Sequence, residues 1–208
     1  MKKIAQILPL SILSFICLIT SCSPEDEQEL PNYSPVIFHD DFEWFTQGNL
    51  ELNSWTNDVK VGNKPWKFET RNNNSYLLFT GFVSNNDVAN GVTKDAVNES
   101  WIISKELDLD RANKKRLTFI STQGFVSDTT KNDLTLYVIH NITNANADTV
   151  QLNFTKPVLG GQNFKWINSG IVNLEAFKGK IKIAFKATGS GTDGNADGTY
   201  EVDNIKVF

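Results

Sequence analysis

The sequence is poor in residues that cross-link or react. It contains two cysteines, one methionine and two histidines in 208 residues. Cys17 and Cys22 both lie near the N-terminus, so the rest of the chain has no internal disulfide. Basic residues are outnumbered as well, because 20 Lys and Arg face 24 Asp and Glu. Since binding to phosphates needs a basic face, this balance argues against nucleic acid as a partner.

Catalytic motifs are also missing. The sequence contains no G-x-S-x-G, no HExxH, no P-loop and no Cys–His pair. His39 and His140 lie at the edges of expected strands, and neither has a partner nucleophile in a recognised pattern. Glycoside hydrolysis needs two carboxylates at a defined separation. The sequence of a chain with many acidic residues does not give the distances between them, so it does not exclude such a pair. We therefore expect a protein that is not an enzyme, with a glycan-active hydrolase as the least favoured alternative.

The first 21 residues have the features of an export signal. Two lysines precede the apolar segment Ile4–Ile19, which is short and interrupted compared with the roughly 20 apolar residues of a membrane span. Small residues follow, and Ile19-Thr20-Ser21-Cys22 resembles a lipobox. The resemblance implies that residues 1–21 are a signal peptide and that Cys22 becomes the lipidated N-terminus. An ordinary secreted protein with an unrelated cysteine is the alternative.

Residues 22–35 are expected to form an acidic tether. Ser23–Glu29 carries four carboxylates and no basic residue. Anionic lipid would repel these acids, so they do not serve membrane affinity. The segment resembles the tag that directs Bacteroidota lipoproteins to the outer face of the outer membrane. The resemblance implies a protein that is lipid-anchored in the outer membrane and faces the extracellular side, although a solvated linker has the same composition.

The remainder of the chain, residues 36–208, has the pattern of an all-β domain. It is rich in aromatic residues, which favour strands. Short alternating runs such as Leu134–Val138 and Lys180–Lys186 are separated by clusters of Asn, Gly and Asp such as Gly189–Gly198. Many short strands divided by turn residues predict an antiparallel sandwich or barrel. The only expected helix is a single turn at Leu174–Lys178.

The last expected strand changes phase. Tyr200 and Val202 share one face of that strand, whereas Ile205 and Val207 belong to the opposite phase. A slip of one residue within a half-buried strand predicts a bulge. Asp203 lies at the break, where a carboxylate can be turned away from the sheet as a ligand would be.

Several segments in order along residues 36–208 resemble one domain family. They are Asp41–Glu43, Trp66, Asn98–Ser104, Leu107–Leu109, Leu117–Phe119, Val172–Leu174, Phe177–Gly179, Ile183–Phe185 and Tyr200–Ile205. The family is that of the choice-of-anchor J domains of Bacteroidota, relatives of the gingipain cleaved-adhesin domains and of MAM-type jelly rolls. The resemblance implies an antiparallel two-sheet jelly-roll β-sandwich, often with structural calcium joining the first and last strands. Such domains serve as adhesins, carbohydrate-binding modules or accessory domains.

Calcium requires six to eight oxygen ligands. Asp41 and Glu43 are two residues apart and are expected to share one face of the first strand, while Asp203 lies on the last strand. Because the resembled fold places these strands side by side, the three carboxylates are the predicted Ca²⁺ site. Ordinary surface carboxylates at strand ends are the alternative.

A second candidate metal site is local in sequence. Asp193, Asn195 and Asp197 match the first half of an EF-type loop, D-x-[DN]-x-[DN]-G. The twelfth position is Asn204, so the bidentate glutamate of such loops is missing. A hairpin loop rich in Gly and Asp is the alternative.

The tryptophans are the candidate ligand contacts. Trp44 and Trp55 flank a polar loop and Trp166 precedes a polar turn, so we expect these three to be exposed and able to stack on sugars. Trp66 and Trp101 fall within strands and are expected in the core. The sequence thus predicts a binding module for glycan or an adhesin, with a protein-interaction subunit of a surface complex as the alternative.

The export signal makes a prediction for the cell. Cys22→Ala is expected to release the protein from membranes, because it removes the lipidated residue. Replacing Glu25, Asp26 and Glu27 by Ala should leave the protein anchored but facing the periplasm. Protease treatment of intact cells measures the difference, and equal exposure of the wild type and the triple variant would contradict the surface-export interpretation.

Overall fold

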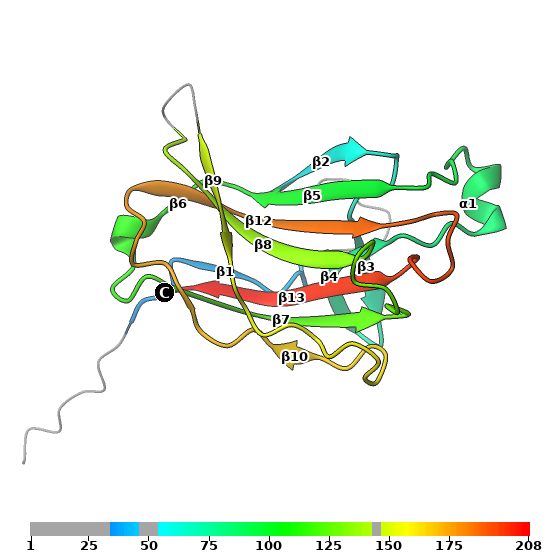
Figure 1. The fold of residues 1–208 in the computed structure, drawn as a ribbon. Helices are drawn as coiled ribbons and strands as arrows, with labels where there is room; N and C mark the ends of the chain where they lie inside the picture. The colour runs from blue at the N-terminus through cyan, green and yellow to red at the C-terminus, as the bar shows by residue number, and fades with distance from the viewer. Residues whose placement is uncertain (1–33, 46–53, 143–146) are drawn as a thin grey trace, which may run out of the picture. The chain divides into compact units, whose positions relative to one another are not determined.

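Two antiparallel sheets packed face to face make up the part of the chain that the computed structural model describes, residues 34–45, 54–142 and 147–208 (Figure 1). Residues from Ser34 to Phe208 belong to one compact unit. Both sheets are wholly antiparallel, as the sequence predicts for a two-sheet sandwich. The predicted all-β sandwich is therefore confirmed.

The first sheet has seven strands. Five follow the order β10-β7-β13-β4-β3, while β1 pairs with β13 and β11 pairs with β7. Their bounds are β1 (Phe38–Asp40), β3 (Lys67–Arg71), β4 (Asn74–Thr80), β7 (Arg116–Gly124), β10 (Ile167–Asn168), β11 (Val172–Asn173) and β13 (Thr199–Val207). The first and last strands of the domain are thus direct neighbours, as the resemblance implies.

The second sheet has six strands. Five follow the order β2-β5-β12-β8-β9, and β6 pairs with one end of β12. Their bounds are β2 (Trp55–Val61), β5 (Asn98–Ser104), β6 (Leu107–Asp108), β8 (Asp133–His140), β9 (Asp148–Leu152) and β12 (Lys180–Gly189). The longest strand, β12, lies at the centre and pairs with both β5 and β8.

In the described part of the chain, helix is confined to two short elements, α1 (Asn85–Ala89) and the 3₁₀ helix η1 (Leu109–Arg111). The helical turn expected at Leu174–Lys178 is wrong, because that segment forms a plain turn. Helix α1 is instead fixed by a capping box in which Ser84 and Asp87 exchange hydrogen bonds. No helix among the described residues is long and apolar enough to span a bilayer.

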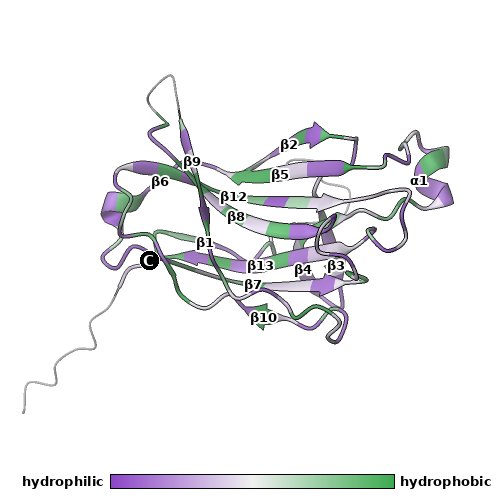
Figure 2. Cartoon of the chain, viewed as in Figure 1, coloured by the Kyte–Doolittle hydropathy of each residue, from purple (hydrophilic) through white to green (hydrophobic). Residues whose placement is uncertain are grey.

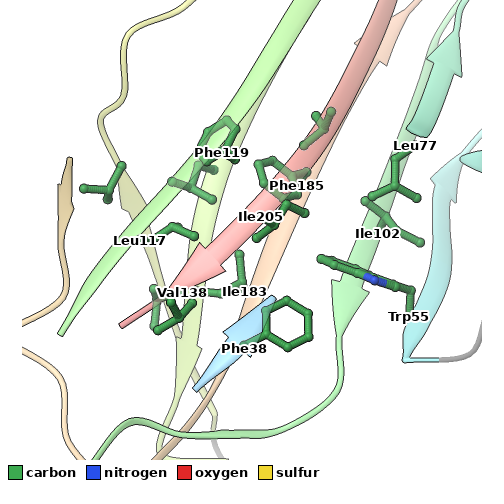
Figure 3. Close-up of a cluster of buried hydrophobic side chains, with 14 of the residues drawn as sticks. Phe38, Trp55, Leu77, Ile102, Leu117, Phe119, Val138, Ile183, Phe185 and Ile205 are labelled. Atoms are coloured by element: carbon green, nitrogen blue, oxygen red, sulfur yellow. The ribbon is translucent and has the colours of Figure 1, made fainter. Parts of the chain in front are cut away.

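Alternation along the strands divides each sheet into an inner and an outer face (Figure 2). In β5 the burial of successive residues alternates from end to end, with Ile102 fully buried. The core lies between the sheets and draws side chains from both (Figure 3): Phe38, Leu77, Leu117, Phe119 and Ile205 from the first sheet, and Trp55, Ile102, Val138, Ile183 and Phe185 from the second. Since side chains alternate between the two faces of a strand, the packing of one set between the sheets places the alternate set on the outer faces.

The predicted bulge in the last strand is confirmed. The pairing of β13 with β7 shifts between Asp203 and Lys206. Asn204 takes a left-handed conformation with φ of 53°. On the other side of β13, the neighbour changes at the same point from β4 to β1. The bulge therefore lets one strand serve two partners while apolar residues on both sides of it face the core.

Phe185 offers a test of the core. Its ring is fully buried and meets Phe119 edge-on at a centroid distance of 5.0 Å. Phe185→Ala is expected to lower the free energy of unfolding by about 3–5 kcal/mol, because it leaves a cavity between the sheets. Urea unfolding measures this loss. The matched control Phe82→Ala removes a ring that is 53% exposed and should cost less than about 1 kcal/mol; similar losses in both variants would contradict the assignment of the core.

Candidate functional site

Trp55 is buried, so its predicted exposure is wrong. Its side chain is 3% exposed and its ring meets those of Phe38 and Phe42. The indole Nε1 donates a 2.8 Å hydrogen bond to Oδ2 of Asp40. The reason lies in the strand, because Trp55 occupies an inward position at the start of β2 and fills the core.

Trp44 is held by the same carboxylate. Its Nε1 donates to Oδ1 of Asp40 at 2.7 Å, and its half-buried ring meets Phe68 edge-on at 5.0 Å. The backbone N–H of Phe42 donates to Oδ1 as well. Asp40 thus accepts three hydrogen bonds and links β1 of the first sheet to Trp55 of the second. This gives Trp44 a structural contact in addition to its predicted role as a ligand contact.

Trp166 lies beside the outer face of the first sheet. It directly precedes β10, is half-buried, and meets Tyr76 of β4 edge-on at 5.8 Å. Beneath this region Glu201 is 3% exposed, and its Oε1 has no hydrogen-bond partner among the described residues. Burial raises the pKa of Glu201, and burial together with the nearby Glu201 charge raises the pKa of Tyr76 to about 12. Trp166 therefore covers a polar interior more than it offers a free ring.

An outward-facing aromatic pair lies on the second sheet and consists of Trp101 and Tyr137. The centroids of the two rings are 4.6 Å apart, at an interplanar angle of 40°. Trp101 comes from β5 and Tyr137 from β8, on either side of β12. Both rings are partly exposed, and neither belongs to the core between the sheets. The expectation that Trp101 is a core residue is therefore wrong.

Polar side chains fix the edges of both rings. The indole Nε1 of Trp101 donates to Oε1 of Glu99 at 2.9 Å, and the hydroxyl of Tyr137 donates to Oε1 of Gln151 at 3.3 Å. Lys186 projects from β12 between the rings, with its Nζ 5.7 Å from each ring centroid and 3.9 Å from Oε2 of Glu99. We call these five residues the aromatic face.

The floor of the aromatic face is narrow and apolar. Ala184 lies opposite both Ile103 and Tyr137 in the sheet, and it is fully buried although it belongs to the outward phase of β12. Lys182 and Lys186 lie on either side of it along the strand. Because Ala184 is small and fully buried, the larger side chains of the aromatic face cover it, and they form the outer surface at this point.

One signal in the sequence locates this face. In β5, Trp101 shares the phase of Glu99, while the neighbouring Ile102 has the phase of the core. In β12, Lys186 has the opposite phase to Phe185. The period of two therefore places Trp101 outside. The expectation that it lies in the core rested on its place within a strand and did not consider which face of the strand it occupies.

The predicted calcium ligands come close together in part. Strand β1 ends at Asp40, so Asp41 and Glu43 lie in the following turn, and their placement on the strand is wrong. The turn arises because Phe42 adopts a φ of 57° and bonds back to Asp40. Glu43 Oε1 accepts from the N–H of Ser75, and Asp203 Oδ2 accepts from the amide of Asn74. Glu43 and Asp203 thus contact consecutive residues of β4.

The charges of these groups interact. Burial, together with the smaller effects of the carboxylates of Glu43 and Asp41, raises the pKa of Asp203 to about 6. Oxygen donors of this kind fit calcium chemically. Within the described residues, however, no three carboxylate, histidine or cysteine side chains lie close enough together to hold a metal ion. The donor set is therefore chemically suitable, and its three carboxylates are not gathered around one point.

The second candidate loop is organised by hydrogen bonds. Asp193 pairs with Lys131 at 2.6 Å, and its other oxygen accepts from the N–H of Asn195 at 3.0 Å. The backbone carbonyl of Asn195 accepts from Ser127, so it is engaged as well. Asp193 and Asp197 line different hollows. The loop is rich in Gly and Asp, as the alternative states, but it is not a hairpin, because it connects β12 of the second sheet to β13 of the first.

Comparison with known proteins finds resemblance in fold only. No protein-family model matches the sequence, and no curated protein sequence matches it. Similar solved structures include the K1 cleaved adhesin domain of Lys-gingipain from Porphyromonas gingivalis W83, with 18% identity over 82% of this chain and 96% of that one and a TM-score of 0.48. The module TmCBM61, solved with β-1,4-galactotriose, has 16% identity over 76% of this chain and 90% of its own, with a TM-score of 0.46. The C-terminal family 22 carbohydrate-binding module of Clostridium thermocellum Xyn10B has 11% identity over 85% of this chain and 96% of its own, with a TM-score of 0.43.

Asp203 gives a test that separates a buried charge from a calcium ligand. Its pKa is about 6 in the folded chain and about 3.9 in an unfolded one, so folding becomes less favourable as the pH rises from about 4 to 6. When a chelator removes calcium, Asp203→Asn is therefore expected to raise the free energy of unfolding by roughly 1–3 kcal/mol at pH 7.5. It should have little effect below pH 4, where the carboxyl is protonated in both states. Thermal unfolding across this pH range measures the gain.

The same variant tests calcium. If Asp203 binds calcium, millimolar Ca²⁺ should raise the melting temperature of the wild type, because the ion binds only the folded state. It should leave Asp203→Asn unchanged, while the control Asp193→Asn should respond like the wild type. A wild-type melting temperature that is the same in calcium and in chelator would contradict calcium binding. A stabilisation lost only in Asp193→Asn would assign the ion to the other loop.

Proposed function

We propose that this protein is a non-catalytic glycan-binding module and that its aromatic face contacts the sugar. The observation that carries the proposal is the pair of Trp101 and Tyr137, two rings 4.6 Å apart on the outer face of a rigid sheet. Two aromatic side chains that remain outside the core leave apolar area in contact with water. A ligand with an apolar face and a polar rim would cover that area and keep its own polar groups hydrated or bonded.

A pyranose ring has this chemistry. Its axial C–H groups form an apolar face that packs on aromatic rings, and its hydroxyls both donate and accept hydrogen bonds. The aromatic face supplies a carboxylate from Glu99, an amide from Gln151 and an ammonium group from Lys186 around the rings. Donors and acceptors are therefore both within reach of a stacked sugar.

The face is ordered before any ligand arrives. Each ring edge already has a hydrogen-bond partner, and the side chains project from paired strands. Binding therefore immobilises few side chains, which lowers its entropic cost.

The carboxylates beside Trp101 favour binding over hydrolysis. Glu99 is engaged by the indole and by Lys186, and Asp58, which lies opposite Trp101 in β2, pairs with Lys60 at 2.6 Å. A glycosidase needs a carboxylic acid that donates its proton to the leaving oxygen. A carboxylate paired with lysine stays ionised, so Glu99 and Asp58 suit the acceptance of hydrogen bonds from sugar hydroxyls.

We also propose that the module is displayed at the cell surface on a lipid anchor at Cys22. This residue and the acidic tether lie outside the described residues, so the proposal rests on the lipobox-like sequence and on the four acids after it. Attachment to the outer membrane would keep captured glycan next to the cell. Calcium at Asp41, Glu43 and Asp203 would then be structural, because it would join the turn after β1 to β13 far from the aromatic face.

Binding to soluble polysaccharides tests the function. In native gels that contain xylan, galactan, mannan or mixed-linkage glucan, the wild type is expected to be retarded by at least one polymer. Trp101→Ala and Tyr137→Ala should each weaken that binding by about tenfold or more, which corresponds to about 1.4 kcal/mol. Trp101→Phe keeps an aromatic ring but loses the bond to Glu99, and it should retain part of the affinity.

Trp166→Ala is the matched control, because it removes a half-buried indole from the other sheet. Retardation that is unchanged in the Trp101→Ala/Tyr137→Ala double variant, or that is lost in Trp166→Ala alone, would place the sugar site elsewhere. Absence of retardation by every polymer would count against glycan as the ligand.

A further inference from the structure

A second surface feature lies at the end of the first sheet, away from the aromatic face. Phe82 follows β4 and Phe125 follows β7, and their side chains are 53% and 61% exposed. They line a hollow of about 430 Å³ together with Thr80, Asp197 and Thr199. Two large apolar rings at the mouth of one hollow are a costly arrangement in water unless something covers them.

The backbone at this hollow is strained. Phe125 has a φ of 59°, and Phe164, whose ring meets it edge-on at 5.6 Å, has a φ of 58°. Left-handed conformations are rare for bulky residues and cost of order 1–3 kcal/mol each. The N–H of Phe125 is held by Oδ1 of Asn163 at 3.0 Å. The structure therefore maintains an exposed ring in an unfavourable backbone conformation, which is a mark of functional sites.

The polar side chains of the hollow are two hydroxyls and one carboxylate. The Thr199 hydroxyl lies 2.9 Å from the Thr80 hydroxyl, which in turn accepts from the N–H of Phe82. Asp197 is partly buried, and among the described residues its carboxylate forms no ion pair and accepts no hydrogen bond from another residue. Burial raises the pKa of this carboxyl, as expected for a charge without a partner. Among the described residues that line the hollow, Asp197 is thus the one charged side chain, and it has no cationic partner there.

We propose that the hollow between Phe82 and Phe125 is a docking site for a lysine or arginine side chain of a partner protein. An ammonium or guanidinium group has only donors, and it matches a carboxylate that only accepts. Phenyl faces attract cations, and the aliphatic stem of either side chain covers apolar rings. The net negative charge of this chain also favours a basic partner.

The same groups fit a sugar less well. Sugar hydroxyls need donors as well as acceptors, and the described residues that line this hollow carry no side-chain amide or ammonium group. The aromatic face has both kinds of group. The two sites therefore differ in chemistry and lie on different sheets, so the failure of one proposal leaves the other standing.

The test measures binding of a blocked peptide, Gly-Lys-Gly-Lys-Gly, to the full chain immobilised on a sensor surface. The same peptide with both lysines Nε-acetylated is the ligand control, since acetylation removes the charge and keeps the stem. The lysine peptide is expected to bind at least tenfold more tightly than the acetylated one. Asp197→Asn should reduce that binding at least fivefold.

Variants with matched changes make the result specific. Asp193→Asn alters the charge by the same amount in the same loop, and because Asp193 pairs with Lys131 it should leave binding unchanged. Phe125→Gly should abolish binding without lowering the melting temperature sharply, because glycine adopts a positive φ without strain. Phe82→Ala should weaken binding, and Trp101→Ala should not.

Three outcomes would overturn the proposal. Equal losses in Asp197→Asn and Asp193→Asn would show attraction to overall charge without a site. Full binding by folded Phe125→Gly would show that the hollow is not used. No measurable binding of the lysine peptide to the wild type at millimolar concentration, or equal binding of the acetylated peptide, would exclude a cation as the occupant.

Discussion

Face-to-face packing of the two sheets is the interaction on which the rest of this molecule depends. Ile102, Leu136 and Phe185 are fully buried because they point between the sheets. Because successive side chains of a strand point to opposite faces, their neighbours Trp101, Tyr137 and Lys186 point outward. The aromatic face is thus a consequence of the core. A shift of one residue in β12 would turn Lys186 into the core and Phe185 out of it, and the same shift in β5 or β8 would do so for Trp101 and Ile102 or for Tyr137 and Leu136, so the site and the fold share one register.

Local departures from regular structure connect the sheets and shape their ends. The bulge at Asp203 and Asn204 allows β13 to pair with β4 along one half and with β1 along the other. Asp40 then binds the indoles of Trp44 and Trp55 and joins the two sheets at their edge. At the opposite end of the first sheet, the strained Phe125 keeps a ring in solvent beside the unpaired Asp197. One end of this sheet is therefore closed by hydrogen bonds, while the other presents a hollow.

The sequence predicts the features that depend on periodicity and turn residues. Alternating runs predict the two-sheet sandwich, and the change of phase after Val202 predicts the bulge, because both follow from the pleat of a strand. Position relative to loops and strands misplaces Trp55 and Trp101, since a tryptophan next to a loop can point into the core and one within a strand can lie on the outer face. The hollow beside Phe125 and the coupling of Glu43 to Asp203 join segments far apart in the chain. Such features depend on loop conformations that have no simple signature in one sequence.

The most direct test of the central claim, that sugar binds to the aromatic face, is the NMR signal of the tryptophan indole N–H groups during titration with a bound oligosaccharide. The indole of Trp101 donates to Glu99 within the aromatic face, whereas those of Trp44 and Trp55 donate to Asp40. The account predicts that the Trp101 signal, identified by its loss in Trp101→Phe, shifts in proportion to saturation while the signals of Trp44 and Trp55 stay in place. A saturating sugar that leaves the Trp101 signal unmoved and shifts that of Trp166 would contradict it.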